Sequence, residues 1–251
     1  MGARRRLDAE LVRRGLAESR TDAVHAVAAQ RVLVNGAIAE KAARLVAADD
    51  AVTLAGPPAR FVGRGGEKLD AALDHFAVSV CGARFLDVGA STGGFTDCLL
   101  MRGAARVVAL DVGHGQLHPR LRDDTRVDVL ERLNIRHASR ETVGGLVDGA
   151  VVDVSFISLR TVIPAVVALC QPGSPMVLLV KPQFEAGRAE VGRGRGIITD
   201  VAVHDRVQAE IHEALLAAGC TVHGWMPSPI LGGRGNREFL VHASTAAGAE
   251  Q

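Results

Sequence analysis

The apolar residues between about 84 and 243 occur in short runs separated by segments with helical spacing. The runs have the length of strands and are apolar on both faces. Strands that alternate with helices predict an α/β fold, a largely parallel sheet covered on both faces. We expect the last segment, NREFLVHAS, to form an antiparallel edge strand. The expected strands are 84–88, 106–111, 126–130, 149–154, 175–181, 220–226 and 237–243.

The first sixty residues follow a different pattern. Two short helical runs come first; Gly15 is expected to close the first and Ser19 to cap the second. A short strand, the turn Asn35-Gly36 and another strand follow. This predicts a small α+β domain over residues 1–58, a flexible linker over 59–66, and a large domain over 67–245 with a helix opened by Lys68.

A glycine-rich loop follows the first strand of the large domain. Gly89, Gly93 and Gly94 allow a sharp turn and a close approach to a ligand, and Thr96 is expected to cap the next helix. The following strand ends in Asp111, an acid suited to ribose hydroxyls. Together these features predict half of a nucleotide-binding sheet. A glycine loop by itself is weak evidence, because many such loops are ordinary tight turns.

The loop sequence GASTGG departs from the dinucleotide pattern GxGxxG. Asp87 stands just before the turn, where it would repel a pyrophosphate. An acid there suits a cofactor with a cationic amino-acid end, which favours S-adenosylmethionine over NAD.

The charge of the chain is small but uneven. Its 251 residues are 48% hydrophobic and 23% charged, as in a globular protein, and the net charge is +1. Residues 1–60 hold ten Lys and Arg against seven Asp and Glu, whereas the remainder is slightly acidic. The excess favours a polyanion-binding module, although a solvated basic face gives the same pattern.

The cysteines and the hydropathy of the chain indicate the cellular compartment in which the protein works. The four cysteines are widely spaced, so neither a zinc site nor a disulfide framework is expected, and reduced thiols suit the cytoplasm. The longest apolar stretches are too short to span a bilayer. We therefore expect a cytoplasmic protein with no membrane partner and no metal.

Four charged residues stand at strand ends or element openings: Lys68, Asp153, Lys181 and Glu238. Ligands of open parallel sheets bind at the carboxyl ends of strands. Each residue alone fits a surface ion pair, but the four together favour a site. Lys181, with Lys68 as a second cation nearby, would act as a base toward a hydroxyl, and the two acids would orient the lysines.

These four residues resemble the Lys-Asp-Lys-Glu set of FtsJ-type ribose methyltransferases. The strings VGRGGEKL, FLDVGASTGGFTDCLL, VVDVSFISL, LVKPQFEAGR and GNREFLVH resemble the TlyA family over nearly the whole chain. The resemblance implies a Rossmann-like methyltransferase sheet and methylation of a cytidine ribose 2′-hydroxyl in the RNA of ribosomal subunits. S-adenosylmethionine would be the donor.

The N-terminal residues resemble an RNA-binding module first seen in a ribosomal small-subunit protein. In that family a glycine usually stands where this chain has Gln30 or Arg31. Phe156 is expected either to stack on an extruded base or to belong to the core. The residues expected to contact RNA are Arg4, Arg6, Arg13, Arg14, Arg20, Lys41, Arg64, Phe156 and Arg193.

The expected donor site gathers around the glycine loop. Asp87 and the loop would hold the methionine part, Asp111 the ribose, and Asp128 with Val129 would border the adenine. The full set is Asp87, Gly89, Ala90, Ser91, Thr92, Gly93, Gly94, Phe95, Asp111, Asp128 and Val129.

Two other functions compete with methyl transfer. The TlyA family has also been called haemolysin, but the sequence offers no long apolar or strongly amphipathic segment for a lytic role. An RNA-binding assembly factor without catalysis is disfavoured because every position of the tetrad is filled.

Overall fold

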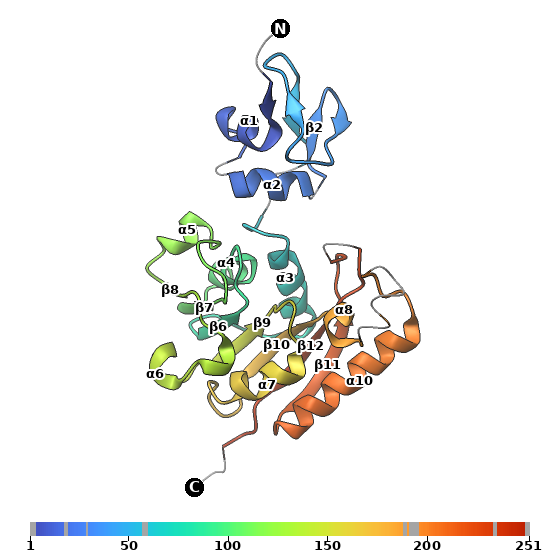
Figure 1. Cartoon of the computed structure of the whole chain (residues 1–251). Coiled ribbons are helices and arrows are strands. Elements are labelled where there is room, and N and C mark those ends of the chain that lie inside the picture. The colour runs from blue at the N-terminus through green and yellow to red at the C-terminus, as the bar shows by residue number, and fades with distance from the viewer. Residues whose placement is uncertain are drawn as a thin grey trace. The chain divides into compact units, whose positions relative to one another are not determined.

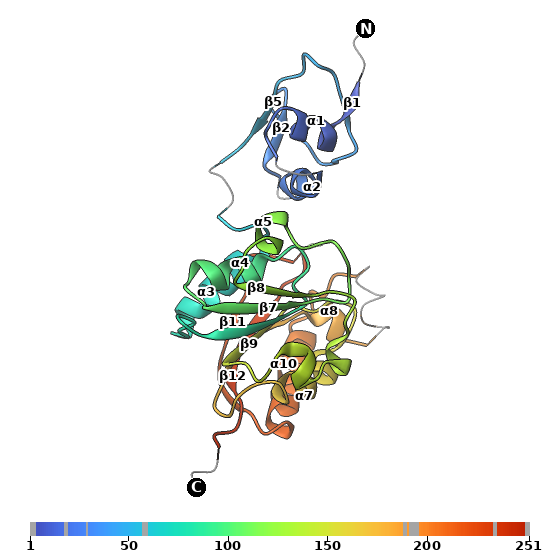
Figure 2. The same cartoon turned by 90° about the vertical axis from the view of Figure 1, so that its left-hand side faces the viewer.

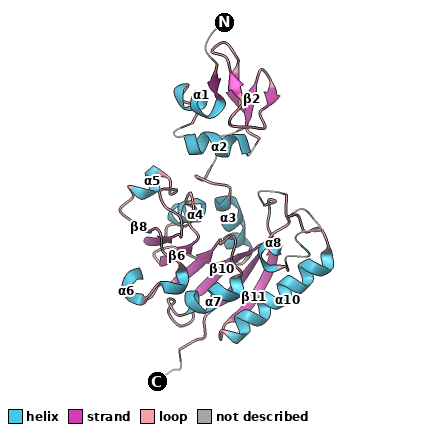
Figure 3. Cartoon of the chain, in the orientation of Figure 1, coloured by secondary structure: helices cyan, strands magenta, loops and turns pink. Residues whose placement is uncertain are grey.

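The structure, a computed structural model, describes residues 4–17, 20–28, 30–56, 60–187, 190, 196–232 and 235–248. The chain divides into two compact units, Met1–Arg60 and Phe61–Gln251. Figure 1 shows the elements of both units in chain order, and Figure 3 separates helices from strands. The expected Ser19 cap and Arg193 lie outside the described residues.

The first unit packs two helices against short strands. A three-stranded antiparallel sheet has the order β3-β2-β5, and β1 pairs with β4. Leu7 and Leu11 of α1 and Val27 of α2 are buried against Val32 and Val34 of β2. The elements are β1 (Arg5–Arg6), α1 (Leu7–Arg13), α2 (Arg20–Ala28), β2 (Val32–Val34), β3 (Ala37–Ile38), β4 (Leu45–Val46) and β5 (Val52–Leu54).

Turns of the first unit form where the sequence predicts them. Asn35 and Gly36 both have positive φ, +52° and +81°, as the hairpin between β2 and β3 requires. Gly15 ends α1 with φ +69°. Gln30 takes the left-handed conformation, φ +58°, after α2, and the next amide, of Arg31, donates to the carbonyl of Ala26. A non-glycine residue thus closes the second helix.

The second unit is built on a seven-stranded sheet with the order β11-β12-β10-β9-β6-β7-β8. Among the strand pairs of this sheet, only those made by β12 are antiparallel. The strands are β6 (Arg84–Val88), β7 (Arg106–Leu110), β8 (Val127–Leu130), β9 (Gly149–Val152), β10 (Pro175–Val180), β11 (Thr221–Pro227) and β12 (Phe239–Ser244). The mostly parallel sheet with an antiparallel C-terminal strand is confirmed; β12 itself lies between β10 and β11, so β11 is outermost.

Helices cover both faces of this sheet, as Figure 2 shows in an edge-on view. Side chains of alternating strand positions point to opposite faces, so Leu86 packs with α7 and α10 and Phe85 with α3 and α4. The central strands β6, β9 and β10 are therefore buried on both faces, which explains why they read as continuous apolar runs. The helices are α3 (Gly65–His75), α4 (Gly94–Met101), α5 (Pro119–Arg122), the 3₁₀ turn η1 (Ile135–His137), α6 (Arg140–Val143), α7 (Leu159–Val167), α8 (Pro182–Glu185) and α10 (Val201–Ala217).

Two local expectations are wrong. The linker expected over 59–66 is not flexible throughout, because Phe61 is buried in the core of the second unit and α3 already begins at Gly65. Thr96 does not cap α4, which begins at Gly94 after Gly93. The Thr96 hydroxyl instead donates to a carboxylate oxygen of Asp87 at 2.6 Å.

Candidate active site

The glycine loop joins β6 to α4 at the carboxyl edge of the sheet. Gly89 and Gly93 have φ of +87° and +98°, which L side chains rarely adopt. A Cβ at Gly89 would lie 2.4 Å from the Asp153 carbonyl oxygen, and one at Gly93 would lie 2.3 Å from Leu121 Cδ1. Both glycines are thus required by contacts within the chain, in addition to any approach of a ligand.

Asp87 is the buried acid of this edge. It is fully buried in β6, and its Oδ1 receives no hydrogen bond from any described residue. Burial raises the pKa of Asp87 to about 7; the Thr96 bond opposes this shift and the charge of Asp153 adds to it. A buried carboxylate oxygen without a donor suits a cationic ligand group.

Asp111 follows β7 and ties two loops together. One carboxylate oxygen accepts the backbone N–H of Ser91 at 2.8 Å, and the other accepts that of Gly113 at 2.6 Å. The carbonyl of Thr92 accepts the N–H of His118. These bonds place the glycine loop and the 111–118 segment side by side at the edge where a donor would bind.

Asp128 and Val129, also expected in the donor site, lie within β8 and not after its carboxyl end. Asp128 is the second residue of β8, in register with Val108 of β7. Its side chain pairs at 2.5 Å with Arg106, which opens β7, so it reaches toward the start of that strand and not toward Asp111, which follows its end. The Arg106 guanidinium lowers the pKa of Asp128. Three apolar members of the expected set, Ala90, Phe95 and Val129, pack with the core.

Glu131, and not Asp128, stands at the carboxyl end of β8. It directly follows β8, as Asp111 follows β7, and it accepts the Gly115 N–H at 2.9 Å. It also pairs with His114 and Arg122. Glu131 was not among the residues expected from the sequence, although its place directly after a strand is a signal that the sequence contains.

The four tetrad residues form two ion pairs. Lys68 Nζ lies 2.6 Å from Glu238 Oε2, with both side chains largely buried. Lys181 Nζ lies 2.5 Å from Asp153 Oδ1 and donates to Ser155 Oγ at 2.9 Å. The expectation that the two acids lie against the lysines matches this geometry, but the immediate neighbour of Lys181 is a carboxylate and not Lys68.

Strand register brings these pairs to one edge. Val180 is paired with Phe239, so Lys181 and Glu238 stand at the adjoining ends of β10 and β12. The Asp153 N–H donates to the carbonyl of Val88, which places Asp153 beside the start of the glycine loop. The expected donor loop and the tetrad therefore share the carboxyl edge of the sheet.

Phe156 does not belong to the core. The residue is 91% exposed and its φ is +65°, a strained value for an aromatic residue. Its ring lies 5.0 Å from that of Phe184, and Lys181 Nζ lies 5.9 Å from the Phe184 ring centroid. An exposed aromatic ring thus stands near the Lys181–Asp153 pair. Phe184 and Ser155 were not anticipated from the sequence.

Most of the arginines expected to contact RNA already have acidic partners. Arg6 and Arg20 pair with Asp8, and Arg13 and Arg14 pair with Glu10, whose pKa these two lower to about 2. Arg14 also donates to backbone carbonyls of the 47–50 turn. Arg14 is therefore a structural residue.

The other expected cations differ in their setting. Arg6, Arg13 and Arg20 keep about half or more of their side-chain surface exposed. Arg4 and Lys41 are also exposed. Arg64, also expected to contact RNA, directly precedes α3 in the second unit.

Two features are absent from the described residues. No helix in the described part of the chain has the length and hydropathy needed to cross a membrane. Within the same residues, no cluster of three or more His, Cys, Asp or Glu has the arrangement of a metal site.

Comparison with known families matches both units. The pattern of FtsJ-like methyltransferases matches residues 61–245, and that of the S4 domain matches residues 5–52. The 16S/23S rRNA (cytidine-2′-O)-methyltransferase TlyA of Mycobacterium tuberculosis is 47% identical over 246 residues, covering 98% of this chain and 91% of that protein. Hemolysin A of Brachyspira hyodysenteriae is 38% identical, covering 94% and 98%.

A solved structure supports the same grouping. A protein from Streptococcus thermophilus described as a hemolysin superposes with a TM-score of 0.77 at 40% identity, covering 98% of this chain and 90% of that one. The family resemblance read from the sequence is thereby confirmed. The chain is an enzyme of the TlyA group in the FtsJ-like methyltransferase family, with an S4 domain at its N-terminus.

Proposed function

We propose that the chain methylates the ribose 2′-hydroxyl of a cytidine in ribosomal RNA, with S-adenosylmethionine as the methyl donor. The activity printed for the Mycobacterium tuberculosis relative supports the substrate. The observation that carries the proposal is the contact of Lys181 Nζ with Asp153 and Ser155 at the carboxyl edge of the sheet. This arrangement offers an amine, a carboxylate and a hydroxyl to an alcohol substrate.

The residues at the glycine loop fit this donor. Asp87 Oδ1 is buried and receives no hydrogen bond from the described residues, which suits the ammonium of an amino-acid end. Asp111 retains acceptor capacity beyond its two backbone donors, because each carboxylate oxygen has two lone pairs. We assign it to the ribose hydroxyls. The donor, when bound, supplies a methyl group on a positively charged sulfur.

In the transfer, an O–C bond forms, a C–S bond breaks, and the ribose hydroxyl loses its proton. We assign that proton to Lys181 Nζ, which Asp153 and Ser155 hold in place. The Lys68–Glu238 pair supplies a second buried cation and anion at the same edge. The exposed ring of Phe156 supports stacking on a base turned out of its strand.

The first unit supplies affinity for RNA in this proposal. The S4 match and the exposed cations Arg4, Arg6, Arg13, Arg20 and Lys41 support phosphate contacts. We leave Arg14 out of this set, because its guanidinium donates hydrogen bonds to backbone carbonyls within the first unit. We place the enzyme in the cytoplasm, where ribosomal subunits are.

The test uses the full chain, labelled S-adenosylmethionine and purified ribosomal subunits. We expect label in rRNA, and mass spectrometry of the digested RNA should place it on a cytidine 2′-oxygen. Lys181→Ala should lose about 10²–10⁴-fold in rate, the range for acid–base groups. Label on a base, or no label above the level of Lys181→Ala, would overturn the proposal.

A further inference from the structure

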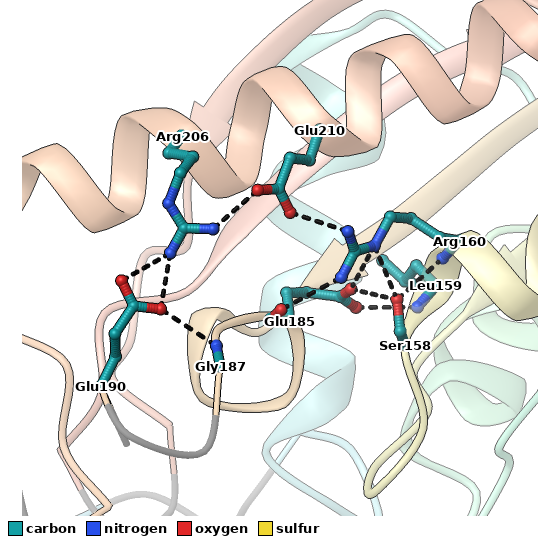
Figure 4. Close-up of polar contacts among 8 residues, drawn as sticks. All are labelled: Ser158, Leu159, Arg160, Glu185, Gly187, Glu190, Arg206 and Glu210. Carbon is teal, nitrogen blue, oxygen red and sulfur yellow. Dashed lines mark hydrogen bonds and ion pairs between the residues drawn. The ribbon is translucent and has the colours of Figure 1, made fainter. Parts of the chain in front are cut away.

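A buried carboxylate joins the two loops that carry the proposed catalytic groups. Glu185 ends α8, the short helix that begins directly after Lys181. Ser158 and Leu159 begin α7, directly after the loop that carries Asp153, Ser155 and Phe156. Glu185 lies between these two segments, and Figure 4 shows its contacts.

Both carboxylate oxygens of Glu185 accept hydrogen bonds from residues at the start of α7. Ser158 Oγ donates to Oε2, and the Leu159 N–H donates to Oε1 at 2.8 Å. Only 6% of Glu185 is exposed. The Leu159 amide is one of the first N–H groups of a helix, where a carboxylate is favoured by both hydrogen bonding and the helix dipole.

Further contacts anchor this junction to α10. Arg160 donates to the Glu185 carbonyl at 3.2 Å and pairs with Glu210 at 2.9 Å. Glu210 in turn pairs with Arg206 at 2.6 Å, as Figure 4 shows. This outer part of the network is partly exposed, so its ion pairs contribute little energy. The buried Glu185 contacts are the strong ones.

The loop held in this way contains a strained residue. Phe156, two residues before Ser158, has φ +65°, and such a conformation persists only where the surrounding structure imposes it. Ser155, three residues before Ser158, contacts Lys181. A shift of the α7 start would therefore move both the exposed ring and the hydroxyl that holds Lys181.

We propose that Glu185 is a positioning residue that sets the loop of Asp153, Ser155 and Phe156 against Lys181. This inference rests on the proposed function, because it assigns Glu185 a role through those residues. Misplacement of reacting groups by about 1 Å can cost about 10²-fold in rate. Glu185 has no described contact with the glycine loop, so donor binding should not depend on it.

The experiment measures single-turnover methyl transfer to ribosomal subunits at saturating donor and RNA. Glu185→Ala should lose about 10- to 100-fold in rate, while donor affinity and RNA affinity stay within about twofold of wild type. Glu185→Gln should recover most of the rate, because its amide oxygen accepts the Leu159 N–H and its amide N–H donates to the Ser158 hydroxyl. Glu210→Gln is the matched control and should behave as wild type.

Ser158→Ala removes the Ser158–Glu185 hydrogen bond from the other side, together with the bond that the Ser158 hydroxyl accepts from the Arg160 N–H. This variant tests the positioning role if Glu185→Ala does not fold. It should lower the rate roughly tenfold, and the loss in the double variant Glu185→Ala with Ser158→Ala should be smaller than the product of the two single losses. Wild-type rates for Glu185→Ala or Ser158→Ala, or a loss explained by weaker binding alone, would overturn the positioning role. A wild-type chain that transfers no methyl group would instead refute the proposed function.

Discussion

Lys181 lies between the carboxylate of Asp153 and the hydroxyl of Ser155, and this placement suggests a direct test of its proposed role as the base. Its amine is paired with Asp153, so acting as a base requires that Nζ first release a proton. The wild-type single-turnover rate should then rise with pH. Lys181→Arg keeps the charge but cannot be deprotonated at working pH, and we expect it to lose about 10²–10⁴-fold.

The measurement is methyl transfer to ribosomal subunits over a pH series, with donor affinity measured in parallel. Donor affinity should be unchanged in Lys181→Arg. If this variant kept near-wild-type activity and the same pH profile, Lys181 would stabilise charge and would not be the base. The methyltransferase assignment would survive that outcome.

Asp87 gives a second prediction, in which stability and donor binding respond in opposite directions. Burial raises its pKa to about 7, above the unfolded value near 3.8. Its contribution to the free energy of unfolding is therefore full below about pH 4 and lost as the pH rises through about 7. Asp87→Asn should raise the thermal midpoint at pH 8 relative to wild type, with little gain at pH 4.

The same substitution should weaken donor binding, because the amide carries no charge for the cationic end. Wild-type donor affinity should fall as the pH drops below about 7, and that dependence should flatten in Asp87→Asn. Calorimetric titration at pH 6 and pH 8 measures both effects. Equal donor affinity in the two proteins would remove Asp87 from the donor site.

At the scale of elements, the β6–α4 junction depends on glycine for two reasons. Gly93 has φ +98° and no room for a Cβ, since Leu121 and Leu117 lie within 3 Å of that position. Gly93→Ala should lower stability by about 1–3 kcal/mol through backbone strain, more with the clash, and should weaken donor binding sharply. RNA affinity should remain nearly intact.

Gly82→Ala is the matched control for this prediction. Gly82 also has positive φ, +72°, but a Cβ there meets no atom within 4 Å. Gly82→Ala should therefore lower stability through backbone strain alone and leave donor affinity unchanged. Equal donor affinities for Gly93→Ala and Gly82→Ala would show that the loop is not part of the donor site.

At the scale of the whole molecule, the two units separate RNA affinity from chemistry in our proposal. Replacing Arg4, Arg6, Arg20 and Lys41 by Ala should weaken ribosome binding and flatten its salt dependence by up to about one unit of log–log slope per lost contact. Arg6 and Arg20 already pair with Asp8, so their share should be the smaller one. Donor affinity, set in the other unit, should not change.

Binding to ribosomal subunits is measured over a salt series. Arg126→Ala, which removes an exposed cation paired with Asp124 in the second unit, serves as control and should bind as wild type. Full retention of binding by the fourfold variant would remove these cations from the RNA contacts.

The sequence by itself determined the elements and the order in which they occur. Strands buried on both faces leave continuous apolar runs, and the Asn35-Gly36 pair specifies a hairpin through its positive φ angles. The acid after β7 and the lysine after β10 could be located because both lie at the end of an apolar run. These are local patterns, so one chain suffices to read them.

The tertiary structure alone decided which side chains meet. Lys68 and Glu238 are 170 residues apart, and only the insertion of β12 beside β10 brings Glu238 to the edge of the sheet where Lys181 lies. Asp128 lies within β8, and its side chain pairs with Arg106 at the start of β7, a contact that the sequence does not show. Phe156 could not be assigned to core or surface, since its exposure depends on a left-handed backbone that its sequence does not require. Contacts between distant elements are set by strand order and register, which no local pattern contains.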